Sequence, residues 1–220
     1  MPGKMRELEE HINKQQPETN NYTPSFYRLE KAEEYKALTS LLSSNPHIRV
    51  HDHIESQLKE LIKISNPTRR LTPEEYEQHL AAYVGDKALE EIGVWVYYPW
   101  ADRIVHIVDE EDFIALRTSR NQHKIMKDEI EKLRTKKIGI IGLSVGGSIA
   151  LTIAMERVCG ELRLADFDKI ELTNMNRIRT GIHNIQVSKA VVAAREIAEL
   201  DPFIKVRCYL DGATEQNLDD

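Results

Sequence analysis

The spacing of apolar residues divides the chain into two parts. Before about residue 120, apolar positions recur mostly every three or four residues, which predicts amphipathic helices over residues 25–42, 52–66 and 72–83. The last of these begins with Thr72-Pro73-Glu74-Glu75, a capping-box sequence that is typical of a helix start, and Gly85 is placed to end it. Residues 1–24 show no such pattern and are predicted to form a mobile tail.

The first part of the chain also contains strand signals. A short strand is predicted over residues 47–50, and residues 94–98 and 103–108 predict a hairpin because they are rich in β-branched and aromatic side chains. A short helix is expected next, with acidic residues 109–112 at its start. The aromatic side chains around the hairpin are interpreted as packing groups rather than a platform for nucleic-acid bases, since no basic stripe accompanies them: Trp95, Tyr97, Tyr98 and Trp100.

From Lys137 onward, short apolar runs alternate with longer amphipathic segments. The runs KIGIIG, ELRLADFD and FIKVRCYL predict strands, and the segments GGSIALTIAMERV and VSKAVVAAREIAEL between them predict helices. Strands joined by helices of this length form a parallel βαβ arrangement. We therefore expect an α/β domain with a parallel sheet over residues 117–220, preceded over residues 25–116 by a smaller, mostly helical α+β region.

Composition and charge limit the classes of function. The 220 residues are 41% hydrophobic and 30% charged, which describes a soluble globular chain of one or two domains. A net charge of -6 gives no overall electrostatic reason to bind nucleic acid or anionic lipid. The uncharged run from Ile138 to Met155 reaches the length of a membrane-spanning helix, but its four glycines favour a strand, a turn and a helix in succession. No membrane segment is expected, and the absence of a secretory signal predicts a cytoplasmic protein.

Cysteine and histidine provide no metal motif. Cys159 and Cys208 stand apart from each other, which favours buried thiols over a zinc or redox pair. His47, His51 and His53 lie close together, but no third ligand at a suitable spacing accompanies them. We therefore predict no protein-held metal site.

A glycine-rich turn after the first strand of the parallel sheet is the first candidate site. Gly142-Leu143-Ser144-Val145-Gly146-Gly147 follows a strand and opens a helix, where backbone N–H groups and the helix dipole favour an anion. A tight turn without a ligand remains the alternative. Asp166 ends the next strand, 24 positions after Gly142, where an α/β sheet places a carboxylate for a nucleotide ribose. Asp168 follows on the same side, with a solvated aspartate as the alternative.

Polar and cationic residues follow that strand and lead into the next helix. They lie where a bound triphosphate would be placed, although a solvated loop would have the same composition: Asn174, Arg177, Arg179 and Lys189.

A family resemblance bears on these alternatives. The runs GLSVGGS and ADFDKIELTNMNR, followed by Lys189 twelve residues after Arg177, resemble the adenylate-forming ThiF/MoeB and ubiquitin-activating E1 superfamily. Upstream, Arg117-Thr118-Ser119-Arg120-Asn121 is similar to that superfamily's R-x-x-R-[QN] motif. The resemblance extends from about residue 113 to residue 220, and it implies a partial Rossmann-like, ThiF/E1-type sheet.

The resemblance implies a role for each matching residue. The turn residues Gly142, Ser144, Gly146 and Gly147 would lie under the α-phosphate of ATP, and Asp166, with Asp168 beside it, would hold the ribose. The groups that would contact the phosphates are Asn174, Arg177 and Lys189. Arg120 would reach into the nucleotide site of a neighbouring subunit, which implies a homodimer through the Arg117–Arg120 region.

The implied reaction is adenylation of a carboxylate with ATP and Mg²⁺. In this superfamily the carboxylate is often the C-terminus of a ubiquitin-like or sulfur-carrier protein. Ser144 departs from the pattern, since a glycine is usual there. The superfamily's later strands and an ATP-binding aspartate have no counterpart before residue 220, so a fragment or a shortened relative is expected. Two alternatives stay open: an NAD(P)-dependent oxidoreductase, and a non-catalytic interaction protein.

Overall fold

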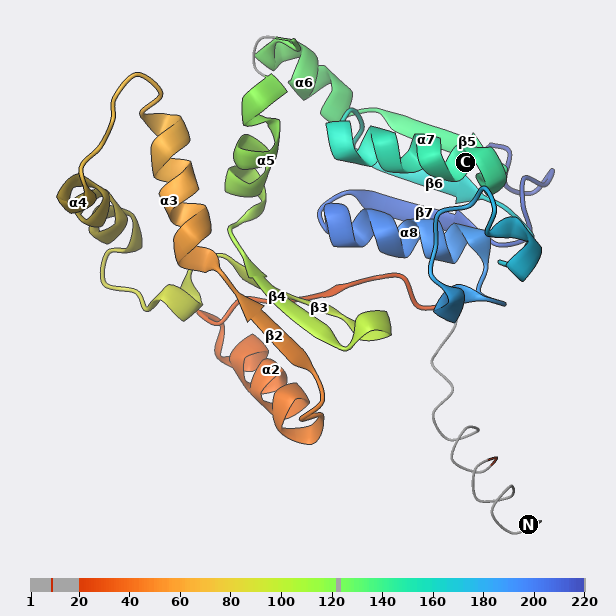
Figure 1. The fold of residues 1–220 in the computed structure, drawn as a ribbon, viewed down its shortest axis with the longest axis horizontal. Coiled ribbons are helices and arrows are strands. Elements are labelled where there is room, and N and C mark those ends of the chain that lie inside the picture. Colours follow the sequence, from red (N-terminus) through yellow and green to blue (C-terminus); the bar gives the residue numbers. More distant parts are fainter. Residues whose placement is uncertain (1–8, 10–19, 122–123, 220) are drawn as a thin grey trace.

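The computed structural model describes residues 9, 20–121 and 124–219. It contains two sheets, one in each part of the chain (Figure 1). The N-terminal sheet has the strand order β1-β3-β4-β2. Its strands are β1 (Ser25–Tyr27), β2 (Arg49–Asp52), β3 (Val94–Tyr98) and β4 (Arg103–Ile107). The predicted hairpin is confirmed, since β3 pairs antiparallel with β4.

The helices that precede the second sheet are α2 (Ala32–Ser44), α3 (Ile54–Ser65), α4 (Pro73–Val84), α5 (Glu110–Thr118) and α6 (Lys127–Arg134). Short 3₁₀ turns are η1 (Leu89–Glu91), η2 (Pro99–Ala101) and η3 (Ser119–Asn121). The capping box at the start of α4 is confirmed: Thr72 Oγ1 accepts from the Glu75 N–H, and Glu75 Oε2 accepts from the Thr72 N–H. Gly85 ends α4 at a φ of 62°, as the sequence predicts.

The expectation of one helix over residues 25–42 is wrong. Residues 25–27 form strand β1, which pairs antiparallel with β3, and the helix begins only at Ala32. Phe26 and Leu29 have helical spacing, but long-range pairing with β3 decides the conformation of this segment. The predicted strand at 47–50 is shifted by two residues, to Arg49–Asp52, where it pairs in parallel with β4.

The predicted mobile tail lies outside the described residues up to residue 19, apart from residue 9. Residues 20–24 contact the C-terminal domain. The carbonyl of Asn21 accepts a hydrogen bond from Arg195 Nε at 2.7 Å, and the Tyr22 hydroxyl accepts one from the Cys208 N–H at 3.4 Å. The segment just before β1 is therefore attached to the second sheet.

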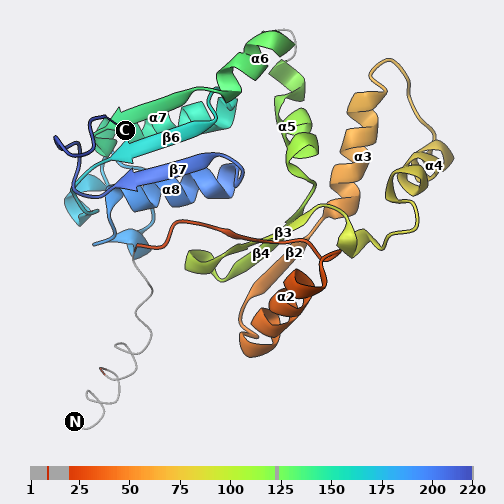
Figure 2. The same cartoon turned by 180° about the vertical axis from the view of Figure 1, so that it is seen from behind.

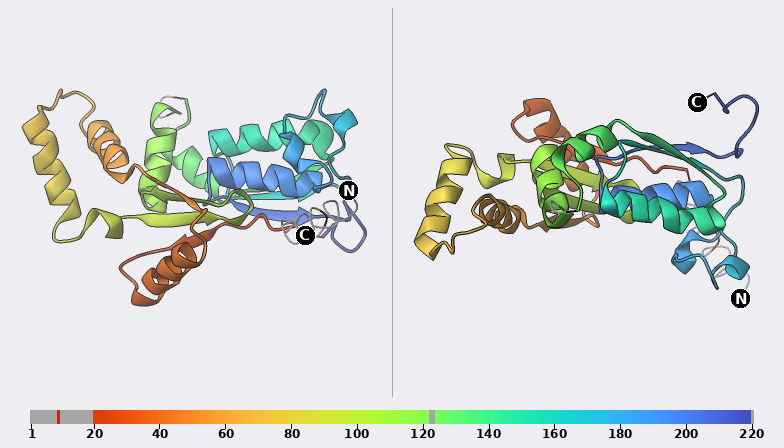
Figure 3. Two further views of the ribbon diagram at one scale, coloured as in Figure 1. Left: turned by 60° about the horizontal axis from the view of Figure 1, so that its bottom comes forward. Right: turned by 90° about the horizontal axis from the view of Figure 1, so that it is seen from above.

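The C-terminal sheet is parallel, with the order β5-β6-β7. Its strands are β5 (Lys137–Ile141), β6 (Glu161–Ala165) and β7 (Lys205–Tyr209), joined by α7 (Leu143–Glu156) and α8 (Lys189–Leu200), with η4 (Leu172–Asn174) and η5 (Ile182–Asn184) in the second connection. Both helices lie on one face of the sheet, and Figure 2 shows the opposite face without a helix over it (Figures 2 and 3). The predicted α/β class and parallel βαβ arrangement are confirmed.

Alternation along the strands explains where the core lies. Leu162 and Leu164 on β6 point toward α7 and α8 and are fully buried. Small side chains on the helices let them approach the sheet closely, and Ala150, Ala154, Ala190 and Ala194 are all fully buried. The uncharged run from 138 to 155 is thus a strand, a turn and a helix, and no helix in the described ranges is long and apolar enough to cross a membrane.

Buried charge joins the two parts of the chain. Asp201, just after α8, is fully buried and accepts hydrogen bonds from Arg157 Nη1 at 2.8 Å and Arg117 Nη1 at 3.1 Å. Arg157 also lies 3.4 Å from Glu110 at the start of α5. Burying a charge is costly unless the charge is paired. Loss of one member of this cluster would therefore leave another buried charge without its partner.

Candidate functional site

The glycine-rich turn joins β5 to α7 at the carboxyl edge of the parallel sheet. Gly142 has a φ of +80°, a conformation that side chains disfavour, and its N–H donates to the carbonyl of Ala165 on β6 at 2.9 Å. A Cβ on Gly146 would lie 2.6 Å from Ile140 Cγ2, so this glycine lets α7 pack closely on β5. A Cβ at Gly147 would meet nothing within 4 Å. The first turns of α7 therefore have open space beside Gly147.

Asp166 ties the start of α7 to the end of β6. Its buried carboxylate accepts the Leu143 N–H on Oδ2 at 2.6 Å and the Asp168 N–H on Oδ1 at 2.8 Å. A carboxylate has about four acceptor positions, so two protein donors leave capacity for ligand hydroxyl groups. Asp166 thus has a structural role at the helix N-terminus and the acceptor chemistry that a ribose requires.

Lys189 is brought to this turn although it is 45 residues from Ser144 in sequence. The bridge between Lys169 and Ser188 and the hydrogen bond from the Lys189 N–H to the Asp168 carbonyl bring the start of α8 to the end of β6. The Lys189 ammonium lies 2.6 Å from Asp168 Oδ2 and 3.4 Å from Ser144 Oγ, and its side chain is only 5% exposed. A held cation therefore lies at the N-terminus of α7, where an anion is favoured.

Asn174 and Arg177 make local contacts in the loop after β6. Asn174 is buried, and its Oδ1 accepts the Glu171 N–H at 3.0 Å, which caps the short turn η4. Arg177 is exposed and donates to the carbonyl of Thr173 at 3.4 Å and to Asn176 Oδ1 at 3.1 Å. Neither side chain is hydrogen-bonded to the Lys189 cluster, so their predicted contacts with phosphates stay predictions.

Arg117 and Arg120 lie at the other end of α7. Arg117 donates to Asp201 and to the carbonyl of Met155 in the last turn of α7, so it holds the fold together. Arg120 is exposed and has no ion pair within the described part of the chain. The 14 residues of α7 span about 20 Å. Within one chain, Arg120 is therefore remote from the glycine-rich turn.

A small cavity of about 30 Å³ lies between α7 and α8 beside Lys189, with Ser144, Ser148, Arg179 and Glu196 among its lining residues. Burial raises the pKa of the Glu196 carboxyl to about 7, with repulsion from Glu199 adding to the effect and Arg179 opposing it. Sequence reasoning missed Glu196, because helical spacing alone does not distinguish it from a solvated glutamate. The charge of Glu196 therefore changes near neutral pH.

Glu196→Gln is expected to stabilise the protein at pH 8 but not at pH 5. A folded-state pKa above the unfolded value means that stability falls as pH rises from about 4.5 to about 7, because the folded protein binds the proton more tightly. Melting temperatures of wild type and variant across this range measure the effect. The neighbouring, exposed Glu199 is unsuitable as a control because it binds Trp100, so Glu60→Gln serves, at an exposed position of α3. A pH-independent difference would contradict the shift.

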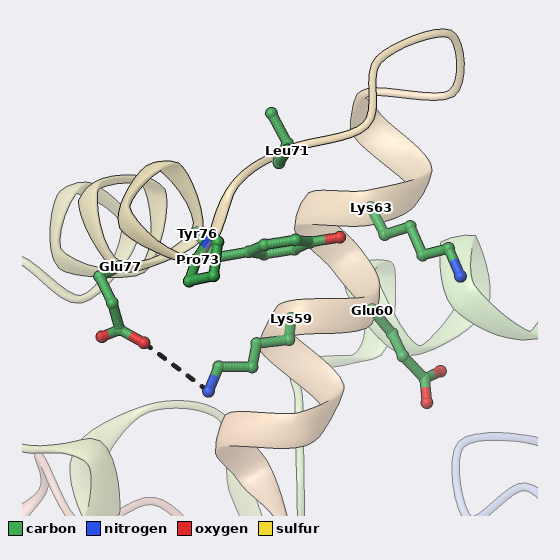
Figure 4. Close-up of a pocket in the computed structure, with 7 residues that line it drawn as sticks. All are labelled: Lys59, Glu60, Lys63, Leu71, Pro73, Tyr76 and Glu77. Carbon is green, nitrogen blue, oxygen red and sulfur yellow. Dashed lines mark ion pairs between the residues drawn. The ribbon is translucent and has the colours of Figure 1, made fainter.

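A separate pocket lies between α3 and α4, and Figure 4 shows its lining. Its volume is about 420 Å³, with Leu71, Pro73 and Tyr76 as its apolar wall. Lys59 at its rim is paired with Glu55 and Glu77. The pocket is remote from the parallel sheet (Figure 1) and contains none of the predicted site residues.

The weaker constellations have ordinary structural roles. Trp95 and Tyr98 are buried, as the packing interpretation predicts, and Trp95 stacks on His106 at 4.0 Å. Cys159 is buried and Cys208 partly buried. Among the residues that the structure describes, no group of three or more His, Cys, Asp or Glu side chains is arranged to hold a metal ion.

The strand, glycine-rich turn, helix N-terminus and acidic strand end together form the partial Rossmann-like arrangement of an α/β domain. Residues 118–220 match the ThiF family. The predicted superfamily is thereby confirmed. The match begins at residue 118, two residues before Arg120. Arg117, the first arginine of the R-x-x-R segment, therefore lies just outside the match.

Several relatives are similar to this chain. Uncharacterized protein MT1398 of Mycobacterium tuberculosis (strain CDC 1551 / Oshkosh) is 40% identical over 179 residues, which is 81% of this chain and 23% of that protein. Ubiquitin-like modifier-activating enzyme 5 of Bombyx mori is 32% identical over 103 residues, 47% of this chain and 26% of that enzyme. The chain thus spans about a quarter of the length of these relatives.

Among solved structures, E. coli tRNA N6-threonylcarbamoyladenosine dehydratase, TcdA, in complex with ATP is 26% identical. The match covers 48% of this chain and 44% of that one, with a TM-score of 0.45.

Proposed function

We propose that this chain binds ATP at the carboxyl edge of the parallel sheet, and that the protein to which it belongs activates a carboxylate by adenylation. The observation that carries the proposal is the position of Lys189, held beside Ser144 and Asp168 at the N-terminus of α7. This arrangement places a cation and free helix N–H groups together, which is what polyphosphate recognition requires.

The chain's own residues account for the chemistry that such a reaction needs. When a carboxylate attacks the α-phosphorus of ATP, negative charge builds on phosphate oxygens and pyrophosphate leaves, so positioning and electrostatic stabilisation suffice. Lys189 and the N–H groups of Ser144 and Val145, in the first turn of α7, would stabilise that charge. Asp166 would orient the ribose, and Asn174 and Arg177 would reach the phosphates if their loop closes over them.

Mg²⁺ would be held mainly by the nucleotide. The ion keeps several water ligands and uses one or two carboxylates together with substrate phosphates. Asp168 fits this role because its side chain is about half exposed, whereas Asp166 is occupied by two backbone N–H groups. Bound Mg²⁺ would supply further charge neutralisation on the phosphates.

The substrate we propose is the C-terminal carboxylate of a ubiquitin-like or sulfur-carrier protein. The support is the ThiF family match and the similarity to ubiquitin-like modifier-activating enzyme 5. One face of the sheet is uncovered, and the chain spans only part of each relative. Activity is therefore measured on a longer protein that carries this chain.

Two measurements test this proposal. In thermal-shift titrations of the 220-residue chain, Mg²⁺-ATP is expected to raise the melting temperature and NAD to leave it unchanged. A longer protein carrying this chain is expected to exchange labelled pyrophosphate into ATP only when a carboxylate substrate is present. Stabilisation by NAD alone would favour the oxidoreductase alternative, and stabilisation by neither nucleotide would favour a non-catalytic interaction protein.

We further propose a homodimer in which Arg120 completes the partner's site. One face of α7 is exposed and uncharged over most of its length, through Val145, Ser148, Ile149, Thr152 and Met155. If two copies of α7 cross in antiparallel fashion around a two-fold axis, each C-terminal end meets the partner's N-terminal end. Arg120, at the C-terminal end, would then approach the partner's glycine-rich turn.

Arg120→Ala is expected to lower the adenylation rate about 10³-fold, as loss of an arginine that stabilises phosphoryl transfer does. Mixing it with Lys189→Met tests whether Arg120 acts in trans. A mixed dimer contains one site with Lys189 from one subunit and Arg120 from the other, so co-expression restores activity in part. No restoration, with dimers present by light scattering, would place Arg120 in the site of its own chain or outside any site.

A further inference from the structure

Phe167 is an apolar side chain that the fold does not bury. It lies between Asp166 and Asp168 at the carboxyl edge of the parallel sheet, and it is 76% exposed. A large aromatic side chain gains about 2 kcal/mol or more from burial. This one instead faces solvent next to the residue proposed to hold the ribose.

Phe167 lies one residue beyond the carboxylate that ties β6 to α7. The pairing of β6 with β7 extends to residue 166, whose N–H donates to the Tyr209 carbonyl at 3.3 Å. Asp166 turns toward α7, where it accepts the Leu143 N–H, and Phe167 is the next residue, with its ring beside Gly212 after β7. The two side chains thus flank one point of the backbone.

The neighbours of Phe167 hold its ring but leave its surface open. A Cβ on Gly212, after β7, would lie 3.1 Å from Phe167 Cδ1, so the ring rests against the bare backbone of this glycine. Phe167 and Gly212 together form a small apolar surface.

We infer that the Phe167 ring is the stacking surface for the base of the bound nucleotide. This inference rests on the ATP-binding function proposed above. The base is attached to the ribose next to the hydroxyl-bearing carbons, so a ribose held by Asp166 places the base beside residue 167. A flat base offers the apolar face that an exposed aromatic ring takes, and stacking of this kind tolerates any base.

Phe167→Ala tests the inference, with isothermal titration of the 220-residue chain by Mg²⁺-ATP and by Mg²⁺-tripolyphosphate, which has no base. ATP is expected to bind about 10- to 100-fold more weakly to the variant, the loss typical of one stacked base, while tripolyphosphate binding stays unchanged. Phe167→Tyr keeps the ring and should retain wild-type affinity. ATP and GTP should lose affinity by the same factor, because stacking does not distinguish them.

Tyr35→Ala removes a similarly exposed aromatic from α2 and serves as the matched control. Circular dichroism checks that each variant is folded, which is expected because Phe167 contributes little buried surface. Wild-type ATP affinity in Phe167→Ala would overturn the inference and leave the proposed function standing, as would an equal loss for tripolyphosphate. Failure of the wild-type chain to bind ATP would overturn both.

Discussion

Replacement of Asp201 with alanine is expected to lower the free energy of unfolding by about 3–5 kcal/mol, the usual cost of removing one partner from a buried ion pair. Asp201 is fully buried and bonds both Arg157 and Arg117, so its loss leaves the buried Arg157 guanidinium with the longer, 3.4 Å pair to Glu110. Urea unfolding at pH 7, followed by circular dichroism, measures the change. A loss of this size is a large part of the 5–15 kcal/mol typical of a domain.

Asp109→Ala is the matched control for the Asp201 variant. Asp109 also pairs with an arginine, Arg28, at 2.8 Å, but its side chain is 54% exposed. An exposed pair contributes about 0–1 kcal/mol, so this variant should unfold almost as the wild type does. Equal losses from the two substitutions would show that burial of the Asp201 cluster does not determine its contribution.

Lys189→Met is expected to weaken Mg²⁺-ATP binding about 10- to 100-fold and to lower the adenylation rate about 10²-fold. The substitution keeps the apolar stem of the buried side chain and removes the ammonium that lies between Asp168 and Ser144. A hydrogen bond to a charged group contributes about 1.5–3 kcal/mol, and loss of a group that stabilises transition-state charge lowers the rate further. Isothermal titration and pyrophosphate exchange measure the two effects.

Stability should change little in Lys189→Met, because Asp168 is about half exposed and water replaces the lost ammonium. Lys137→Ala is the control, since this exposed lysine begins β5 at the opposite edge of the sheet. Equal ATP affinity in Lys189→Met and Lys137→Ala would show that Lys189 does not contact the nucleotide. The position of Lys189 would then no longer support the proposed function.

The C-terminal domain was predictable in detail because its signals are local. Apolar strands of five residues, a glycine-rich turn and alanine-rich helices alternate without interruption, so strand positions and sheet type follow from the pattern. The fold of the N-terminal region is less predictable from local sequence. Phe26 and Leu29 have helical spacing, yet residues 25–27 pair with β3 some 70 residues away, and no local signal reveals that pairing.

The candidate site divides in the same way. Gly142, Asp166 and Lys189 were identified by motif, and the structure brings these three elements together. The exposure of Phe167 and the partial burial of Glu196 depend on packing between distant segments, namely Gly212 against the ring and α7 against α8. Motif positions do not carry that information, so both residues were missed.

The sequence by itself determined the class of sheet, the position of the glycine-rich turn and the ThiF-type motif, because each is carried by short runs of neighbouring residues. Only the tertiary structure decided which charges are buried. Asp201, Arg157 and Arg117 look like ordinary surface residues in the sequence, and they meet because α5, α7 and α8 end at the same place. Long-range packing fixes their environment, and environment sets what a charge contributes.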